Sequence, residues 1–233
     1  MDRTSAKLVG MIKAVIFDMD GLLIDSEPMW QQAEMAQFAK VGLELTPEMC
    51  TQTTGMRIDE VIQHWYEQFP LNKQPLSREA LKQHILDDVI DRIRKHGKPR
   101  PGVGYILDFF RDIGVKMALA SSSHYRVINA VLDVLHIAHY FQVIHSAEEE
   151  PYGKPHPAVY LTTAEKLNVS PGECLAFEDS LNGVIAAKAA RMRCVVVPPE
   201  AHLHDPRFAL ADLVLASLRE FDELRWAEIN ARP

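Results

Sequence analysis

Long apolar runs are missing from this 233-residue sequence, and their absence excludes a membrane-spanning protein. No stretch approaches the roughly 18 uninterrupted apolar residues that a transmembrane helix needs. Residues 1–10 also lack the apolar segment of a signal peptide, so we expect a loosely held tail there. The sequence therefore predicts a cytoplasmic protein that has no membrane among its partners.

Cysteine and clustered positive charge are also scarce. The three cysteines, Cys50, Cys174 and Cys194, have no metal-ligand spacing, which favours buried, reduced thiols in a cytosolic protein. The 25 Lys and Arg residues stand against 32 Asp and Glu residues, and no basic cluster interrupts the net charge of −7. We therefore do not expect the protein to bind nucleic acid. An acidic protein that binds an anionic substrate needs a metal and a few well-placed cations.

The chain is organised around one apolar segment followed by two acids. Residues 14–17 are all apolar, which is typical of a strand covered on both faces in a parallel sheet. Asp18 and Asp20 follow, and their spacing of two points both carboxylates to the same side of an extended backbone. Two carboxylates so close together repel each other, and a bound cation is the usual relief. Gly21 lets the chain turn away beside a ligand.

The rest of the sequence divides into a helical segment and an alternating α/β part. From residue 28 to about residue 99 the apolar residues recur at helical spacing, and no strand-like run appears. After it, strands alternate with helices, which predicts right-handed βαβ units and a Rossmann-like, doubly wound parallel sheet. We expect a catalytic core of residues 11–26 and 98–233 and an all-helical cap domain of residues 27–97. The expected strands are 14–17, 115–120, 141–144, 174–177, 194–197 and 213–215. One expected helix ends near residue 42. The other expected helices span 58–69, 77–93, 103–113, 124–135, 157–167 and 182–190.

Three of the expected strands run directly into polar residues. The first ends in the two acids, the second in three serines that begin at Ser121, and the fourth in Glu178 and Asp179. Because the carboxyl ends of parallel strands lie along one edge of a sheet, we expect these groups to converge. Lys154, in a loop fixed by two prolines, is expected to join them. Carboxylates, a hydroxyl and one lysine suit a hard divalent cation beside a phosphate, and Mg²⁺ fits best.

Taken singly, three of these residues have ordinary structural interpretations. Ser121 is typical of a turn or of the start of a helix. Lys154 is typical of a solvated surface side chain, and Asp179 of a cap on the following helix. Only their joint placement favours a functional site.

Four short motifs thus follow one another in the chain: Asp18-Met-Asp20-Gly, Ser121, Lys154 and Glu178-Asp179. In this order they resemble the four motifs of the haloacid dehalogenase superfamily of phosphotransferases. The resemblance extends from about residue 12 to residue 218. The stretch 20–27 and the helices after it resemble the β-phosphoglucomutase-like branch, which has a helical cap. The stretches 55–59 and 187–193 are similar to those of bacterial 2-deoxyglucose-6-phosphate and hexitol phosphatases.

The resemblance implies a chemical role for each motif. Asp18 would attack phosphorus and form an aspartyl-phosphate, and Asp20 would be the general acid and base. Ser121 and Lys154 would hold the transferring phosphoryl oxygens. The Mg²⁺ ligands would be the Asp18 carboxylate, the Asp20 backbone carbonyl and Asp179, with Glu178 nearby or bridged through water.

The resemblance also implies a substrate class, a small phosphorylated sugar or sugar alcohol of the hexose, hexitol or 2-deoxyglucose 6-phosphate type. A monomer is the default expectation for a compact capped enzyme. Trp30 could offer an apolar face to a sugar or be a core residue, and Arg57 could contact substrate or be a surface charge. In the pattern of β-phosphoglucomutase, a histidine and an arginine of the cap stand where Trp30 and Ile58 stand here, which favours hydrolysis over the mutase reaction. A sugar-phosphate-binding protein without catalysis is the third hypothesis. The candidate substrate-binding residues are Glu27, Trp30, Gly55, Met56, Arg57, Ser121, Ser122 and Lys154.

Overall fold

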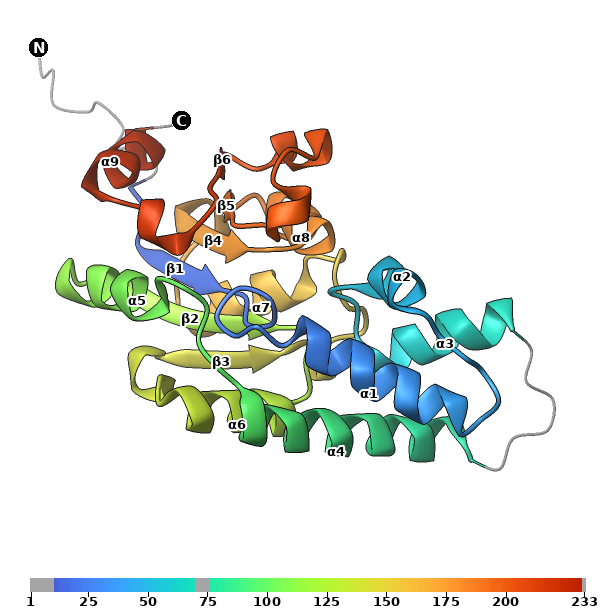
Figure 1. Ribbon diagram of the computed structural model, residues 1–233. Coiled ribbons are helices and arrows are strands. Elements are labelled where there is room, and N and C mark those ends of the chain that lie inside the picture. Colours follow the sequence, from blue (N-terminus) through green and yellow to red (C-terminus); the bar gives the residue numbers. More distant parts are fainter. Residues whose placement is uncertain (1–10, 70–75, 232–233) are drawn as a thin grey trace, which may run out of the picture.

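The computed structural model describes residues 11–69 and 76–231, and a parallel β-sheet lies at its centre (Figure 1). Residues 1–10, for which the sequence predicts a loosely held tail, lie outside the described residues. The strand order is β3-β2-β1-β4-β5-β6, and each neighbouring pair is parallel. This order confirms the prediction of a doubly wound α/β fold. The strands are β1 (Ala14–Phe17), β2 (Lys116–Ser121), β3 (Val143–Ser146), β4 (Cys174–Glu178), β5 (Arg193–Val196) and β6 (Leu213–Val214).

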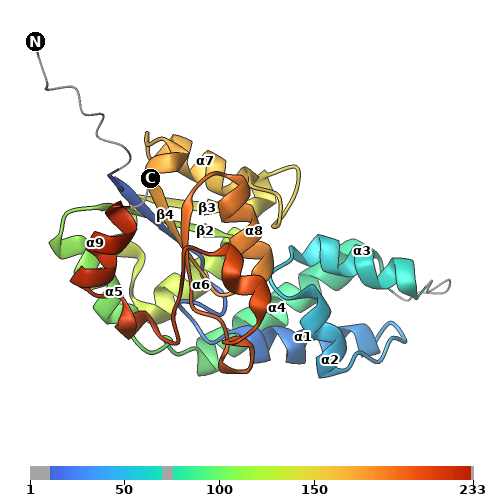
Figure 2. The same cartoon turned by 90° about the horizontal axis from the view of Figure 1, so that it is seen from above.

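The central strand β1 is buried on both faces, which explains its continuous apolar sequence. Val15 and Phe17 belong to a large hydrophobic cluster on one face of the sheet, whereas Ala14 and Ile16 belong to a smaller cluster on the other. Each cluster is completed by helices that cover its face (Figure 2). The first face carries α5 (Val103–Asp112), α6 (Tyr125–Leu135) and α9 (Glu223–Ala231), and the second carries α7 (Ala158–Lys166) and α8 (Leu181–Ala189).

A helical segment lies between β1 and β2 in the chain and beyond the carboxyl ends of the strands in space (Figure 1). We call its helices and connecting residues the helical insertion. Ser77 caps α4 (Arg78–His96), as expected, because its hydroxyl accepts a hydrogen bond from the Ala80 N–H. The limits 27–97 of a separate cap domain stay a prediction. The insertion contains α1 (Glu27–Ala39), α2 (Pro47–Cys50), α3 (Ile58–Gln68) and α4 (Arg78–His96).

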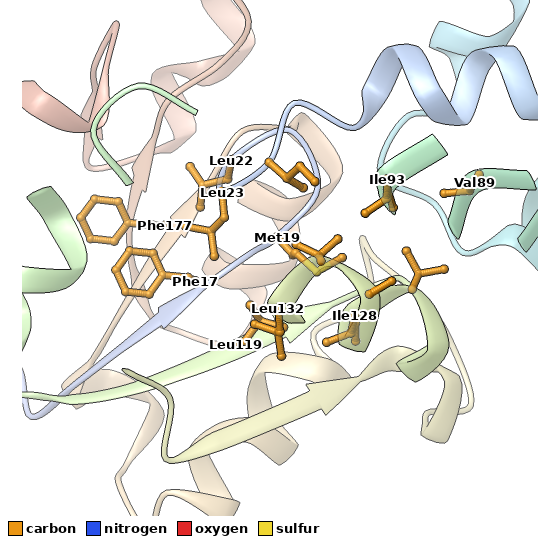
Figure 3. Packing of buried hydrophobic residues seen from close by; sticks show 14 of the residues in the cluster. Phe17, Met19, Leu22, Leu23, Val89, Ile93, Leu119, Ile128, Leu132 and Phe177 are labelled. Carbon is orange, nitrogen blue, oxygen red and sulfur yellow. The ribbon is translucent and has the colours of Figure 1, made fainter. Parts of the chain in front are cut away.

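The large hydrophobic cluster continues from the sheet into the insertion (Figure 3). Met19, Leu22 and Leu23, which follow β1, are fully buried or nearly so in this cluster. Val89 and Ile93 of α4 belong to the same cluster. The insertion is therefore packed onto the core through apolar contacts and is not an isolated bundle.

Two chain segments connect the core with the insertion, one before α1 and one after α4, and they pair with each other. Ile24 forms an antiparallel bridge with Pro99. The Arg100 N–H donates a hydrogen bond to the Leu23 carbonyl at 3.0 Å. The entrance and the exit of the insertion are therefore held side by side.

The structure differs from the sequence prediction at a few elements. β3 begins at Val143, two residues later than expected, because a 3-10 turn at Ala138–Tyr140 precedes it and Phe141 packs against Phe17. Sequence periodicity did not predict the four-residue α2 or the C-terminal α9. The further 3-10 turns are Thr51–Thr53, Ala147–Glu149, Pro171–Glu173, Glu200–His202, Pro206–Leu210 and Leu218–Glu220.

Two expectations from composition concern cysteines and membranes. The three cysteines are buried and free, as expected. Within residues 11–69 and 76–231, no helix has both the length and the apolar character to cross a membrane.

Candidate active site

Polar side chains of three neighbouring strands meet at one edge of the sheet. Asp18 follows β1, Ser121 ends β2 and Glu178 ends β4. Because β1 pairs with both β2 and β4, the three strand ends are adjacent. Asp18, Ser121 and Asp179 line a cavity of about 730 Å³, its open mouth included, between this edge and the helical insertion.

Three buried carboxylates form a cluster at the base of the cavity. One oxygen each from Asp18, Glu178 and Asp179 can be chosen so that all three atoms lie within 4.8 Å of one another. Gly21 has a φ of +78°, and a Cβ at this position would collide with the Asp179 carboxylate. A Cβ at Gly183 in α8 would likewise collide with Glu178. The two glycines therefore make room for the acids.

Lys154 connects two of these carboxylates. Its ammonium group donates to Asp18 Oδ1 and to Glu178 Oε1, both at 2.6 Å, and to the Ala120 carbonyl at 3.2 Å. Tyr160 also donates a hydrogen bond to Glu178. Burial alone lowers the pKa of Lys154, but the two carboxylates outweigh it and raise that pKa. Lys154 is therefore a fixed positive charge at the base of the cavity.

One lysine does not neutralise three acids. Burial raises the pKa of Asp18 to about 8, although the charge of Lys154 opposes the rise. Burial also raises the pKa of Asp179 well above its usual range, and the charge of Asp18 adds to the effect. The donor set is thus rich in hard oxygen ligands and short of positive charge, and it fits a divalent cation.

Asp20 lies beside the cluster and is held by three donors. Its Oδ1 accepts hydrogen bonds from the Ser26 hydroxyl at 2.6 Å and from the Trp30 indole N–H at 3.0 Å. Its Oδ2 accepts from the Ser123 hydroxyl at 2.7 Å. Trp30 is thus a polar partner of Asp20 as well as a packed aromatic side chain. The donors come from the core and from the insertion, so the carboxylate orientation depends on both.

The serines after β2 have separate positions. The Ser121 hydroxyl accepts a hydrogen bond from the Ser123 N–H at 3.0 Å, so it also stabilises the turn. The Ser122 hydroxyl donates to the Gly55 carbonyl of the insertion at 3.0 Å. On the other side of the cavity, the Asn182 amide donates to the Thr54 carbonyl at 3.2 Å. These two hydrogen bonds hold the loop before α3 over the strand ends.

The insertion supplies a polar wall opposite the carboxylate cluster. Glu27, Trp30, Gly55 and Met56, all expected near substrate, line the cavity. Glu27 accepts hydrogen bonds from Thr54 at 2.9 Å and from the Gln31 amide at 3.2 Å. Burial is the main cause that raises the pKa of Glu27.

Arg57 lies away from this wall. Its guanidinium donates to the carbonyls of Ala147 and Glu150 at 2.9 and 2.7 Å and pairs with Asp59 at 2.8 Å. It is not among the residues that line the cavity. Arg57 therefore holds the start of α3 against the core in this structure, and its contact with substrate stays a prediction.

A family model of haloacid dehalogenase-like hydrolases matches residues 12–191. The chain belongs to this family. The matched range contains all four sequence motifs, from Asp18 to Asp179.

Two of the proteins similar to this chain are named for different reactions, a phosphatase and a mutase. The chain is 43% identical to hexitol phosphatase B of Escherichia coli (strain K12) over 210 residues, 90% of this chain and 94% of the relative. It superposes with a TM-score of 0.83 and 27% identity on a mutant CbbY of Rhodobacter sphaeroides in complex with xylulose-(1,5)bisphosphate, over 93% and 99% of the two chains. It superposes on a β-phosphoglucomutase of Clostridium difficile with a TM-score of 0.82 and 27% identity, over 94% of this chain and 97% of the other chain.

Sequence reasoning missed several polar residues of the hydrolase site, among them Ser26, Ser123, Tyr160 and Glu34. Ser26 and Ser123 bond to Asp20, and Tyr160 bonds to Glu178. Glu34 of α1 lines the cavity and is only 7% exposed. Ser26 and Ser123 lie within stretches that the sequence singled out, but Tyr160 and Glu34 lie on helices and carry no local signal.

Proposed function

We propose that this hydrolase is a Mg²⁺-dependent phosphatase of small phosphorylated sugars or sugar alcohols, the hexose, hexitol and 2-deoxyglucose 6-phosphate class. The observation that carries the proposal is the contact of Asp18 with Lys154 and its position close to Glu178 and Asp179, with Asp20 in the same cavity. Support for the substrate class comes from the 43% identity with hexitol phosphatase B. The polar wall of the insertion is compatible with a hydroxylated substrate.

Asp18 and Asp20 carry the covalent steps of the proposed reaction. The Asp18 carboxylate attacks phosphorus and forms an aspartyl-phosphate, while the bond to the sugar oxygen breaks. Asp20 protonates that leaving oxygen and then removes a proton from the water that hydrolyses the aspartyl-phosphate. Such acid–base assistance contributes about 10²–10⁴-fold to the rate. Ser26, Trp30 and Ser123 hold Asp20 in place for both steps.

Positive charge and hydrogen-bond donors hold the phosphoryl group. Lys154 and Ser121 bind its oxygens and stabilise the charge that develops in the transition state. Mg²⁺ would be held by Asp18, the Asp20 carbonyl and Asp179, with Glu178 close by. The ion would supply the positive charge that offsets the repulsion between Asp18 and a phosphate dianion. Apart from the metal, all residues of the proposed site belong to this one chain. We therefore expect a monomer to be active.

The mutase reaction is the second candidate, favoured by the similarity to β-phosphoglucomutase. The two reactions differ in what discharges the aspartyl-phosphate, a water molecule or a second sugar phosphate. Trp30, which donates to Asp20 here, stands where the mutase pattern has a histidine. We therefore favour water as the acceptor.

The deciding experiment assays the purified protein with Mg²⁺ on a panel of hexose and hexitol 6-phosphates. We expect free phosphate, and no phosphate from Asp18→Asn, because a carboxamide is not a usable nucleophile. Conversion of β-glucose 1-phosphate to glucose 6-phosphate without net release of phosphate would establish the mutase instead. Binding of the sugar phosphates without turnover of any of them would establish a non-catalytic binding protein.

A further inference from the structure

We propose that Glu34 is a specificity-determining residue that binds the hydroxyl groups at the uncharged end of the substrate. The inference rests on the proposed phosphatase function and names the residue that selects its leaving group. The carboxyl of Glu34 lies in the insertion half of the cavity, away from the carboxylate cluster and the lysine of the core.

The first argument is position along α1. Glu27, Trp30, Gln31 and Glu34 are spaced by three or four residues, and all four line the cavity. The indole N–H of Trp30 donates a hydrogen bond to Asp20, so this part of α1 lies next to that carboxylate. Glu34 is four residues farther along the helix, which is about 6 Å. It therefore lies where the far part of a leaving group would extend from the reacting phosphate.

The second argument is unused hydrogen-bonding capacity. Glu34 is 7% exposed, and among the residues that the structure describes the Cys50 thiol is the one hydrogen-bonding group that lowers the pKa of its carboxyl. The neighbouring cavity wall includes the apolar side chains of Ile58 and Val61. Burying a carboxyl with one weak partner is unfavourable, and an apolar residue would suit this position better in the free protein. A ligand hydroxyl that both accepts from and donates to the carboxyl would satisfy it.

The protonation of Glu34 is compatible with this role. Burial, foremost, and then the charge of Glu27 raise the pKa of Glu34 to about 8. Near neutral pH the carboxyl is therefore mainly protonated and offers one donor and two acceptor oxygens. That combination matches a hydroxyl group, which is itself donor and acceptor.

The third argument is the charge of the cavity wall. In the described part of the insertion, the cavity lining contains two acids, Glu27 and Glu34, and no Lys or Arg. Arg57, the nearest candidate in sequence, is bonded to the carbonyls of Ala147 and Glu150 instead. A second phosphate on the substrate would thus be desolvated without a counter-charge. The wall fits a polyol monophosphate and not a sugar bisphosphate.

The test compares two substrates in Glu34→Leu, Glu34→Gln and the exposed control Glu44→Gln. Sorbitol 6-phosphate carries a chain of hydroxyls, whereas p-nitrophenyl phosphate has none. In Glu34→Leu we expect KM for sorbitol 6-phosphate to rise about ten- to hundredfold, the usual effect of leaving buried hydroxyls without a partner, with kcat changing less. Glu34→Gln keeps a donor and an acceptor, so its KM should rise less than fivefold by the same reasoning. Values for p-nitrophenyl phosphate, and all values for Glu44→Gln, should stay within about twofold of the wild type.

A matched pair of sugars tests the charge argument. We expect kcat/KM of the wild type to be at least about tenfold lower for fructose 1,6-bisphosphate than for fructose 6-phosphate, which is a modest value for an unpaired charge. Equal kcat/KM for the two sugars, or equal losses on sorbitol 6-phosphate and p-nitrophenyl phosphate in Glu34→Leu, would overturn the inference and leave the phosphatase standing. Failure of the wild type to release phosphate from any of these esters would overturn the proposed function itself.

Discussion

At the scale of single residues, the site depends on how side chains from the two parts of the chain hold Asp20. The Trp30 indole N–H reaches this carboxylate from α1, and the Ser123 hydroxyl reaches it from the core. In the proposed reaction Asp20 is the general acid and must point at the leaving oxygen, so each donor would contribute orientation as well as stability. Trp30 thereby links the position of the insertion to the reactivity of Asp20.

Trp30→Phe tests this link. The variant keeps an aromatic ring in the cavity but removes the N–H donor to Asp20. We expect kcat to fall about ten- to hundredfold, because a hydrogen bond to a charged group contributes roughly 1.5–3 kcal/mol. KM should change little, since the ring still fills its place. Steady-state phosphate release measures both, and an unchanged kcat would show that the indole N–H is dispensable.

The residues that sequence reasoning found and missed differ for a physical reason. Asp18, Ser121 and Asp179 follow apolar strands, and the parallel topology alone brings such strand ends together. The bond from Trp30 to Asp20 depends instead on the rotation of α1 and on how the insertion is seated. Spacing along the chain carries no information on that angle, and the same holds for Glu34.

At the scale of elements, the start of α3 is fastened to the loop after β3. Arg57 donates to two carbonyls of that loop, and the Glu60 carboxylate accepts from the Gly153 N–H at 2.9 Å. The sequence pattern located α3 correctly from its apolar residues but could not indicate where the Arg57 side chain would turn. The periodicity of apolar residues predicts where a helix lies in the chain. The polar contacts that attach the helix to the core depend on tertiary packing, which the sequence pattern does not show.

Arg57→Met should loosen this attachment while keeping the apolar part of the side chain. We expect the free energy of unfolding to fall by about 1.5–3 kcal/mol, because donors of a charged group are lost and buried carbonyls are left unpaired. Urea unfolding followed by circular dichroism measures the change. Hydrogen exchange should also rise in residues 147–153. A raised KM with unchanged stability and exchange would instead support a direct contact between Arg57 and substrate.

At the scale of the whole molecule, the carboxylate cluster and Glu34 make stability depend on ions and on pH. We expect Mg²⁺ to bind the folded chain, whose strand ends bring Asp18 and Asp179 together, more tightly than the unfolded chain. Protons bind the folded chain more tightly than the unfolded chain at Glu34, since burial raises the pKa of that residue to about 8.

Removal of metal should abolish activity and lower the melting temperature. At a Mg²⁺ concentration one hundred times its Kd, we expect about 2.7 kcal/mol of stabilisation relative to the metal-free protein in EDTA. Differential scanning calorimetry measures this shift. Asp179→Asn should show a much smaller shift, because it lacks one ligand. Equal shifts in both proteins would place the cation elsewhere.

Stability should also depend on pH through Glu34. Its pKa in the folded protein, about 8, lies above the ordinary value of 4.5, so its favourable contribution is complete below pH 4.5 and is lost as the pH rises through 8. Glu34→Gln removes this dependence. We expect the stability of the variant relative to the wild type to increase by up to about 1.4 kcal/mol per pH unit between pH 5 and 8. Urea titrations in EDTA measure it, and a difference independent of pH would contradict the assignment.

The paired connections at Ile24 and Pro99 restrict how the active site can admit a substrate. Two backbone segments that are hydrogen-bonded to each other allow the insertion fewer movements than a single flexible connection would. We expect any movement of the insertion about these connections to carry α1 with it and so to separate the Trp30 indole N–H from Asp20. Substrate entry would then be coupled to the loss of one donor that orients the proposed general acid.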